Sequence, residues 1–252
     1  MRLGGIRAVV TGAGSGYGAA IAQGFAQAGA RVACVDLRLP AAQAIAHQLQ
    51  QAGHEAMAVQ CDVSHGASVQ AMTERIAQAW GGFNVLVNNA GISQQPARLG
   101  KTPEAQIDRL LAVNLKSLHH MAVHALPIMR QCKPACIINI ASVTGLRPRP
   151  GMTWYNASKA AMISVTQSMA AELAPEAIRV NAIAPTAAHT PMLEAMFGDR
   201  LQEGIDHVLG TIPLGRLCQG SDVAAAAVYL ASADADFVTG IVLPVDGGRL
   251  VA

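Results

Sequence analysis

Short apolar runs alternate with longer amphipathic segments along the whole 252-residue chain. The short runs are rich in Val and Ile and are nearly continuous, without regularly spaced polar residues. This pattern is typical of parallel strands that are covered on both faces by helices. We expect seven strands, at Ala8–Thr11, Arg31–Asp36, Ala56–Gln60, Val85–Asn88, Cys136–Ala141, Arg179–Ala184 and Gly240–Val245.

Seven amphipathic segments separate these runs and are expected to be helices. They are Tyr17–Ala28, Ala41–Ala52, Ala67–Trp80, Pro103–Met129, Met152–Leu173, Met192–Leu209 and Ser221–Ala231. Alternating strands and helices predict an α/β, Rossmann-like fold, a doubly wound seven-stranded parallel sheet with helices on both faces. No repeat or linker interrupts the pattern, so residues 1–252 are expected to form one nucleotide-binding catalytic domain.

Charge and hydropathy exclude several classes of function. The net charge is only +2 and no basic block occurs, so nucleic acid is not an expected partner. No run reaches the roughly 18 apolar residues of a membrane span, and no signal peptide precedes the first strand. We therefore expect a cytoplasmic protein that does not bind membranes.

Cysteine and histidine residues give no sign of a metal site. The five cysteines are scattered along the chain, which favours reduced thiols over disulfides. His120 and His124 are four residues apart and could share a metal, but no third ligand follows at a suitable spacing. No metal is expected.

The first expected strand runs into a glycine-rich turn, Gly12-Ala13-Gly14-Ser15-Gly16-Tyr17-Gly18, and a helix follows. Glycines allow the backbone to approach a pyrophosphate, and the helix N-terminus offers free N–H groups to it. The alternative is an ordinary glycine-rich loop. Asp36 ends the second strand, where a carboxylate can accept hydrogen bonds from the adenosine ribose and repels the 2′-phosphate of NADP. We therefore predict NAD rather than NADP, although Arg38 is a nearby cation.

Tyr155 and Lys159 are four residues apart, and Ser142 lies thirteen residues before Tyr155. Residues at this spacing share one face of a helix. A free tyrosine has a pKa of about 10, and a fixed cation nearby lowers it. Bringing that pKa toward neutrality requires about 3–4 kcal/mol. The spacing therefore predicts a tuned acid/base that a serine hydroxyl completes, with ordinary helix-surface neighbours as the alternative.

Over essentially its whole length, the chain resembles the short-chain dehydrogenase/reductase family. Thr11–Gly18 matches the family's Thr-Gly-x-x-x-Gly-x-Gly motif, and Asn88–Gly91 matches its Asn-Asn-Ala-Gly motif. Pro185 and Thr190 fit the loop after the sixth strand, and Asp246–Gly248 fits the C-terminal motif. The family's catalytic tetrad is matched in order and spacing by Asn114, Ser142, Tyr155 and Lys159.

The resemblance implies a role for each member of the tetrad. Tyr155 would exchange a proton with the substrate oxygen, and Ser142 would hold and polarise that oxygen. Lys159 would lower the pKa of Tyr155 and bind the nicotinamide ribose. Asn114 would position a water that links Lys159 to a proton path. The hydride chemistry belongs to the cofactor.

The resemblance also widens the expected cofactor site. Asp62 corresponds to an acidic residue that contacts the adenine, and Thr190 to a residue that meets the carboxamide. The expected cofactor-binding residues are Gly12, Ser15, Gly16, Tyr17, Gly18, Asp36, Asp62, Val63, Asn88, Ala90, Gly91, Tyr155, Lys159, Pro185 and Thr190.

One position departs from the family pattern, because Thr186 stands where the family usually has glycine after the proline. Threonine does not easily adopt a positive φ, so we expect the loop on the nicotinamide side to take a different path.

Substrate specificity is expected to lie in residues 186–215, which form a substrate loop or lid. Its apolar lining is expected to come from Trp154, His189, Met192, Leu193, Met196 and Phe197. Arg147 and Arg149 lie between Ser142 and Tyr155, where they either bind an acidic substrate group or are solvated loop residues.

These features predict an NAD(H)-dependent oxidoreductase that interconverts a small-molecule secondary alcohol and its ketone. The alternative within the family is a 3-oxoacyl-[acyl-carrier-protein] reductase. Lys133 and Glu176 occupy the expected carrier-docking positions near the cleft, and one of them is acidic. A different class, a catalytically silent NAD-binding sensor, would have lost a tetrad member. The family is commonly tetrameric, and the many Ala and Met residues of Pro103–Met129 and Met152–Leu173 suit close helix contacts, so we expect a homotetramer.

Overall fold

The computed structural model describes residues 1–252, and its strands form one parallel sheet. The strands are β1 (Arg7–Thr11), β2 (Arg31–Asp36), β3 (Ala56–Gln60), β4 (Val85–Asn88), β5 (Ala135–Ile140), β6 (Ile178–Pro185) and β7 (Val242–Val245). Their order across the sheet is β3-β2-β1-β4-β5-β6-β7, and every neighbouring pair is parallel. The predicted seven-stranded parallel sheet is confirmed.

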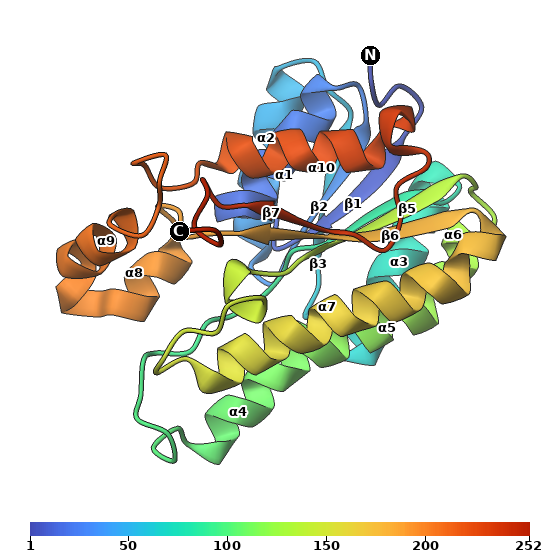
Figure 1. Ribbon diagram of the computed structural model, residues 1–252. Helices are drawn as coiled ribbons and strands as arrows, with labels where there is room; N and C mark the ends of the chain where they lie inside the picture. Colours follow the sequence, from blue (N-terminus) through green and yellow to red (C-terminus); the bar gives the residue numbers. More distant parts are fainter.

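Helices cover both faces of this sheet (Figure 1). One face carries α1 (Gly16–Gln27), α2 (Leu39–Gln51) and α10 (Gly220–Ala231), and the other carries α3 (Gly66–Trp80), α5 (Ser117–His124) and α7 (Thr153–Leu173). Successive strand residues point to opposite faces, so Val10 packs in the α1–α10 layer and Val9 in the α3–α7 layer. Burial on both faces explains why the strands are almost continuously apolar. None of the helices combines the length and apolar character needed to cross a bilayer.

The helix expected over Pro103–Met129 is present, but it is not regular along its whole length. The segment contains α4 (Glu104–Leu111), a π-helical turn (Ala112–Lys116), α5 and α6 (Leu126–Met129). Pro127 lies in the first turn of α6, because proline lacks the N–H that a continuing helix would need. The π-helical turn carries Asn114, and such turns are frequent at functional sites.

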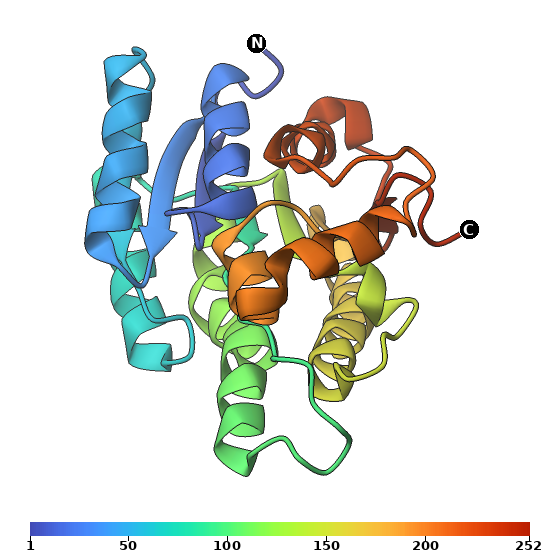
Figure 2. The same cartoon turned by 90° about the vertical axis from the view of Figure 1, so that its left-hand side faces the viewer.

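The expected helix over Met192–Leu209 is also divided, into α8 (Pro191–Phe197) and α9 (Leu201–Leu209). Gly198 has a φ of 52°, a left-handed conformation that glycine adopts readily, and it ends α8. Figure 2 shows both helices, in orange, at the end of the molecule that faces the viewer. The divided segment therefore lies where a substrate would enter.

A reversal in strand order positions the site. The chain fills the sheet outward from β1 to β3 and then in the opposite direction from β4 to β7. A crevice forms outside the carboxyl ends of the strands at such a switch point. The buried Thr11 hydroxyl donates to the carbonyl of Val87 at 3.1 Å and accepts the N–H groups of Asn89 and Ala90, both at 3.0 Å. The loops after β1 and β4 are thereby fixed against each other.

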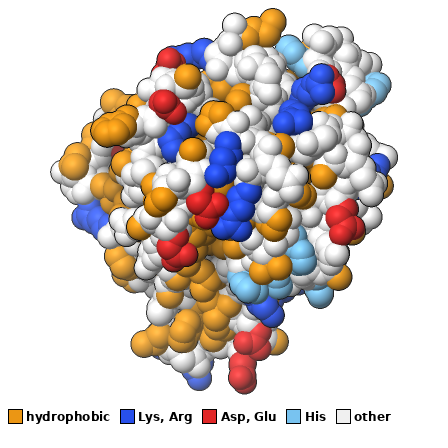
Figure 3. All heavy atoms as spheres, turned by 90° about the vertical axis from the view of Figure 1, so that its right-hand side faces the viewer, with side chains coloured by type: hydrophobic (Ala, Val, Ile, Leu, Met, Phe, Trp, Pro, Cys, Tyr) orange, Lys and Arg blue, Asp and Glu red, His pale blue; other side chains and the backbone are white.

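The outer face of the α5–α7 part of this layer carries many small and apolar side chains. Figure 3 shows hydrophobic side chains gathered on the lower part of the molecule, the part that α4, α5 and α7 form in Figure 1. On α7 the exposed residues include Ala157, Ala160, Ser164 and Ala171, which are small and recur at helical spacing.

Candidate active site

Two adjoining cavities open at the carboxyl ends of the strands. The inner cavity is lined by Ser142, Tyr155 and Lys159 together with residues of the loop after β6. The outer cleft is lined by the glycine-rich loop, Asp36 and the segments after β3 and β4. Both are lined by Tyr17, Asn89, Gly91, Thr190 and Met192, so the two spaces are continuous.

Adjacent parts of the fold supply the Ser142, Tyr155 and Lys159 side chains of the inner cavity. Ser142 follows β5, and its Oγ accepts the N–H of Thr144 at 3.2 Å at the start of a short 3-10 turn. Tyr155 and Lys159 lie in the first two turns of α7. The predicted grouping of hydroxyl, phenol and ammonium is therefore present in one cavity.

A side chain from another loop fixes the start of α7. Gln94 is buried, and its Oε1 accepts the N–H groups of Trp154 and Tyr155 at 3.1 and 3.2 Å. Helix N-termini carry N–H groups without a partner in the helix, and Gln94 satisfies two of them. The sequence does not reveal this contact, because Gln94 lies about 60 residues before the helix that it caps.

Burial dominates the electrostatics of the inner cavity. Lys159 is 4% exposed, its Nζ donates to the carbonyl of Ile140 at 2.7 Å, and burial lowers its pKa to about 8. Burial raises the pKa of Tyr155, whereas the Ser142 hydroxyl acts in the opposite direction. The Lys159 Nζ lies 5.9 Å from the centre of the Tyr155 ring. A lysine with this pKa is still mostly protonated at neutral pH, so a positive charge lies beside the phenol.

Asn114 does not line either cavity but lies directly behind them. Its Oδ1 accepts the N–H of Ile92, and its Nδ2 donates to the carbonyl of the same residue, both at 2.9 Å. A Cβ placed on Gly91 would lie 3.3 Å from Asn114 Oδ1 and 3.6 Å from Lys159 Nζ. The two side chains therefore converge on this glycine, without a direct hydrogen bond between them.

The glycine-rich loop fits a pyrophosphate. Gly16 has a φ of 55°, and a Cβ on Gly18 would collide with the carbonyl of Gly12. Ser15 begins α1 without a side-chain cap, so the N–H groups of the first helical turn remain available to an anion. The loop is shaped for close backbone approach, as a nicotinamide dinucleotide requires.

Asp36 lies in the outer cleft and is 9% exposed. Its Oδ2 accepts the N–H of Gly14 at 2.9 Å, and its Oδ1 accepts the N–H of Arg38 at 3.0 Å. Arg38 and Arg109 line the same cleft, so positive charge is also present there.

The remaining expected cofactor residues divide into two groups. Those that line one or both cavities are Gly12, Ser15, Gly16, Tyr17, Asp62, Val63, Ala90, Gly91, Pro185 and Thr190. Burial acts to raise the pKa of the Asp62 carboxyl, but hydrogen bonds from Ser64 and the neighbouring His65 outweigh it and lower that pKa. Gly18 and Asn88 line neither cavity. Asn88 instead donates from Nδ2 to Asn139 Oδ1 on β5 at 2.8 Å.

Asn89 is a site residue that the sequence analysis missed. It lines both cavities, and its Nδ2 donates to the carbonyls of Thr11 and Gly12 at 2.8 and 3.2 Å. Successive residues at a strand end point in opposite directions, so Asn88 faces the sheet while Asn89 faces the glycine-rich loop. That alternation was a signal available in the sequence.

Thr186 does not require the positive φ that glycine would provide, since Ala177 is the only non-glycine residue with a positive φ. Its N–H donates to Val245 and its carbonyl accepts the Tyr17 hydroxyl at 2.6 Å. Its own Oγ1 accepts from the Arg249 guanidinium at 3.0 Å. The backbone of Thr186 therefore continues the contact of β6 with β7 and holds Tyr17 of the glycine-rich loop. Its side chain contacts Arg249 in the segment after β7.

The substrate loop (residues 186–215) contributes apolar side chains to the inner cavity, and these are Met192, Leu193 and Met196. Trp154, His189 and Phe197, which were expected beside them, are not part of its lining. Phe197 instead lies under the Arg149 guanidinium, with 5.2 Å between the Arg149 Cζ and the ring centre.

The expectation that Lys133 and Glu176 lie near the cleft is wrong. They precede β5 and β6, so they lie at the amino ends of parallel strands, whereas the cavities open at the carboxyl ends. Glu176 also forms a two-bond ion pair with Arg130, at 2.6 and 2.8 Å. These positions therefore provide no argument about carrier docking.

The structure contains no cluster of three or more His, Cys, Asp and Glu side chains placed to hold a metal. His120 Nε2 is buried without a hydrogen-bond partner, and burial lowers the pKa of His120. This histidine lies against Gly66 of α3, away from both cavities.

Comparisons with known proteins agree with this geometry. A family model described as enoyl-(acyl carrier protein) reductase matches residues 12–249. The 4-formylbenzenesulfonate dehydrogenase of Comamonas testosteroni is 43% identical over 96% of each chain. The crystal structure of a 3-ketoacyl-(acyl-carrier-protein) reductase from Brucella melitensis complexed with NADH has a TM-score of 0.90 and 39% identity, covering 98% of this chain and 99% of that one. The crystal structure of a gluconate 5-dehydrogenase from Burkholderia cenocepacia in complex with NADP and tartrate has a TM-score of 0.93 and 34% identity. The match covers 100% of this chain and 97% of that one.

The buried Lys159 predicts a pH-dependent stability. Its pKa falls from 10.5 to about 8 on folding, so between these values the unfolded chain binds more protons. The free energy of unfolding should therefore rise with pH across this window, by up to about 3 kcal/mol from this group. Urea unfolding at several pH values should show wild type gaining stability relative to Lys159→Met from pH 8 to 10.5.

The matched control is Lys101→Met, which removes an exposed lysine and should leave the pH profile of wild type unchanged. Parallel profiles for wild type and Lys159→Met would contradict the assignment of a lowered pKa to Lys159.

Proposed function

The chain belongs to the short-chain dehydrogenase/reductase family of oxidoreductases, and we propose that it interconverts a secondary alcohol and its ketone. The observation that carries the proposal is the convergence of Ser142, Tyr155 and Lys159 in one buried cavity that is continuous with a dinucleotide-shaped cleft. A bound nicotinamide cofactor supplies or accepts the hydride.

The residues of the inner cavity handle the proton. In alcohol oxidation the Tyr155 phenolate takes the hydroxyl proton, and in ketone reduction the phenol returns it. Ser142 Oγ holds the reacting oxygen. A unit charge about 6 Å from a phenolate is worth roughly 3 kcal/mol at an effective dielectric constant of about 20, enough to offset much of the effect of burial. Lys159 supplies that charge, and Asn114 positions a water behind it.

The remaining parts of the chain serve this reaction. We assign residues 1–252 to one catalytic domain, in which residues 186–215 form the substrate loop. Leu193, Ile205 and Val208 pack in a small cluster of their own, and Leu193 also lines the inner cavity. This packing supports the assignment of residues 186–215 as a loop that shapes the substrate space.

A second candidate function is 3-oxoacyl-[acyl-carrier-protein] reduction, which the similarity to the Brucella melitensis enzyme favours. That structure is described with NADH, so a preference for NAD does not separate the two functions. Rates with acyl thioesters and with simple ketones in the same NADH assay do separate them. A catalytically silent sensor is disfavoured because all four tetrad residues are present.

Replacing Tyr155 with Phe removes the proton-transferring hydroxyl and keeps the ring. We expect kcat to fall by about a hundredfold to ten-thousandfold, because general acid–base catalysis contributes about that much. Steady-state rates with a panel of secondary alcohols and ketones measure kcat, and NADH fluorescence measures cofactor binding, which should persist. Tyr229→Phe is the control, since Tyr229 lies on α10 and lines neither cavity. Retention of more than about a tenth of wild-type kcat by Tyr155→Phe would refute the mechanism.

We propose NAD as the preferred cofactor because the Asp36 carboxylate lies in the outer cleft and accepts two backbone N–H groups. Asp36→Ala should lower the ratio of NADPH to NADH dissociation constants by about tenfold to a hundredfold, since it removes charge repulsion. Fluorescence titration measures both constants, and the ratio cancels general damage to the loop. The control is Asp236→Ala, an exposed carboxylate beyond the C-terminal end of α10 that lines neither cavity. Tighter binding of NADPH than NADH by wild type would overturn the assignment.

We propose a homotetramer in which α7 and the α4–α5 segment pack against partner subunits, because Ala157, Ala160 and Ser164 permit close helix contact. Light scattering should give about four times the 26.1 kDa of one chain. Ala160→Arg should yield smaller species, whereas Ala44→Arg on α2 should not. A wild-type monomer at micromolar concentration would contradict this.

A cytoplasmic location, supported by five free thiols of which four are buried, is tested by cell fractionation.

A further inference from the structure

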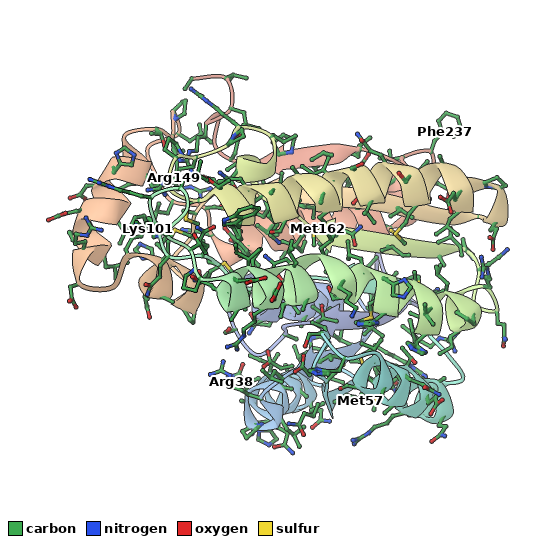
Figure 4. The ribbon with its side chains drawn as sticks, turned by 90° about the horizontal axis from the view of Figure 1, so that it is seen from below. Arg38, Met57, Lys101, Arg149, Met162 and Phe237 are labelled. Carbon is green, nitrogen blue, oxygen red and sulfur yellow. The ribbon has the colours of Figure 1, made fainter.

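The inner cavity contains two arginines in addition to Ser142, Tyr155 and Lys159. Arg149 belongs to the loop before α7, and Arg249 to the segment after β7. Figure 4 shows Arg149 beside the N-terminal end of α7 and close to the substrate loop, with Phe237 at the opposite end of the molecule. Much of the remaining lining is apolar, from Met152, Met192, Leu193 and Met196.

Neither arginine has an acidic partner. The five ion pairs of the structure involve other residues. Asp246 is the nearest acidic influence on Arg249, but its two carboxylate oxygens accept the N–H groups of Gly248 and Leu250 at 3.0 and 2.8 Å. Burial, followed by the charges of Arg149 and Arg147, lowers the pKa of Arg249. Like charges are thus held together at the cavity, and the Asp246 charge offsets them only in part.

Specific contacts hold both guanidinium groups in place while leaving N–H donors free. Arg249 donates one N–H to Thr186 Oγ1 at 3.0 Å. Arg149 lies over the Phe197 ring, and its carbonyl accepts from Asn156 Nδ2 at 2.8 Å, next to Tyr155 in α7. A guanidinium has five N–H donors in a fixed planar arrangement that matches an oxyanion. The unused donors are therefore suited to a ligand.

Arg147 contacts the C-terminal segment and not the inner cavity. Its guanidinium donates to the backbone carbonyls of Arg249 and Ala252, at 3.2 and 2.7 Å, and it does not line the inner cavity. It secures the segment that carries Arg249. Apart from Lys159, the cations that line the inner cavity are therefore Arg149 and Arg249.

We propose that the substrate carries an oxyanion, a carboxylate or a sulfonate, which Arg149 and Arg249 bind while its reacting carbon lies at Ser142 and Tyr155. The inference rests on the proposed alcohol–ketone function for the position of the reacting carbon. An anion provides the charge-assisted hydrogen bonds that the two half-buried guanidinium groups lack, and the methionine-rich lining accommodates an apolar body between the two ends.

Binding tests the inference independently of turnover. The probes are secondary aryl alcohols with a para-carboxylate or a para-sulfonate, each paired with its neutral carboxamide or sulfonamide. Calorimetric titration into NADH-loaded Tyr155→Phe protein measures affinity without reaction. At least one anion should bind more tightly than its neutral partner. That preference should fall by about tenfold to a hundredfold on adding Arg149→Gln or Arg249→Gln, since hydrogen bonds to charged groups contribute about this much.

Three further variants make the result specific. Arg200→Gln removes an exposed arginine of the substrate loop that does not line the cavity, and it should leave the preference unchanged. Arg249→Lys keeps the charge but loses the planar donors, so part of the preference should remain. Thr186→Val removes the hydroxyl that holds Arg249 and should reduce the preference while binding of the neutral probes is maintained.

The outcomes separate this inference from the proposed function. Equal affinity for anionic and neutral probes, no binding of either anion, or a preference that survives both arginine variants overturns it. The carboxylate and sulfonate arms show which oxyanion fits. A preserved preference together with no turnover by wild-type protein supports the anion site and counts against the alcohol–ketone reaction. Turnover by wild-type protein without a preference for the anionic probes supports the alcohol–ketone reaction and counts against the anion site.

Discussion

The parallel register of β1, β4 and β5 is the constraint on which the site depends. Because neighbouring strands run in the same direction, their carboxyl ends reach one edge, and every loop that lines the two cavities starts there. The register is secured by buried polar contacts as well as by the strand ladder. Asn88 donates across to Asn139, and Thr11 joins the loops after β1 and β4. A shift by one residue would turn these groups away from their partners.

Burying Lys159 costs stability, and the chemistry explains why the cost is tolerated. A desolvated ammonium with only one carbonyl partner has a lowered pKa, yet that same desolvation strengthens its field at the phenol. An exposed lysine at the same spacing would be screened by water. Gln94 completes the arrangement, since it fixes the N-terminus of α7 and therefore the direction in which Tyr155 points.

The sequence was sufficient to predict what local patterns encode. Strand runs, the glycine-rich turn, Asp36 and the i,i+4 pair all depend on neighbours in the chain. The structure places Tyr155 and Lys159 in one cavity, but burial raises the pKa of Tyr155, and a local spacing does not reveal burial. Long-range contacts were not predictable in this way. Helix periodicity over Pro103–Met129 does not reveal the π-helical turn at Asn114, which depends on its bonds to Ile92. Lys133 lies away from the cleft because it precedes β5, at the edge of the parallel sheet opposite to the cavities.

Thr186 connects the two ends of the inner cavity. Its carbonyl accepts the Tyr17 hydroxyl from the glycine-rich loop, while its own hydroxyl accepts from Arg249 near the C-terminus. Glycine at this position would keep both backbone groups but lack the hydroxyl, so the guanidinium would lose its one side-chain anchor in the wall. The threonine side chain therefore fixes a cation that lines the same cavity as Tyr155, at a position where the family usually has glycine.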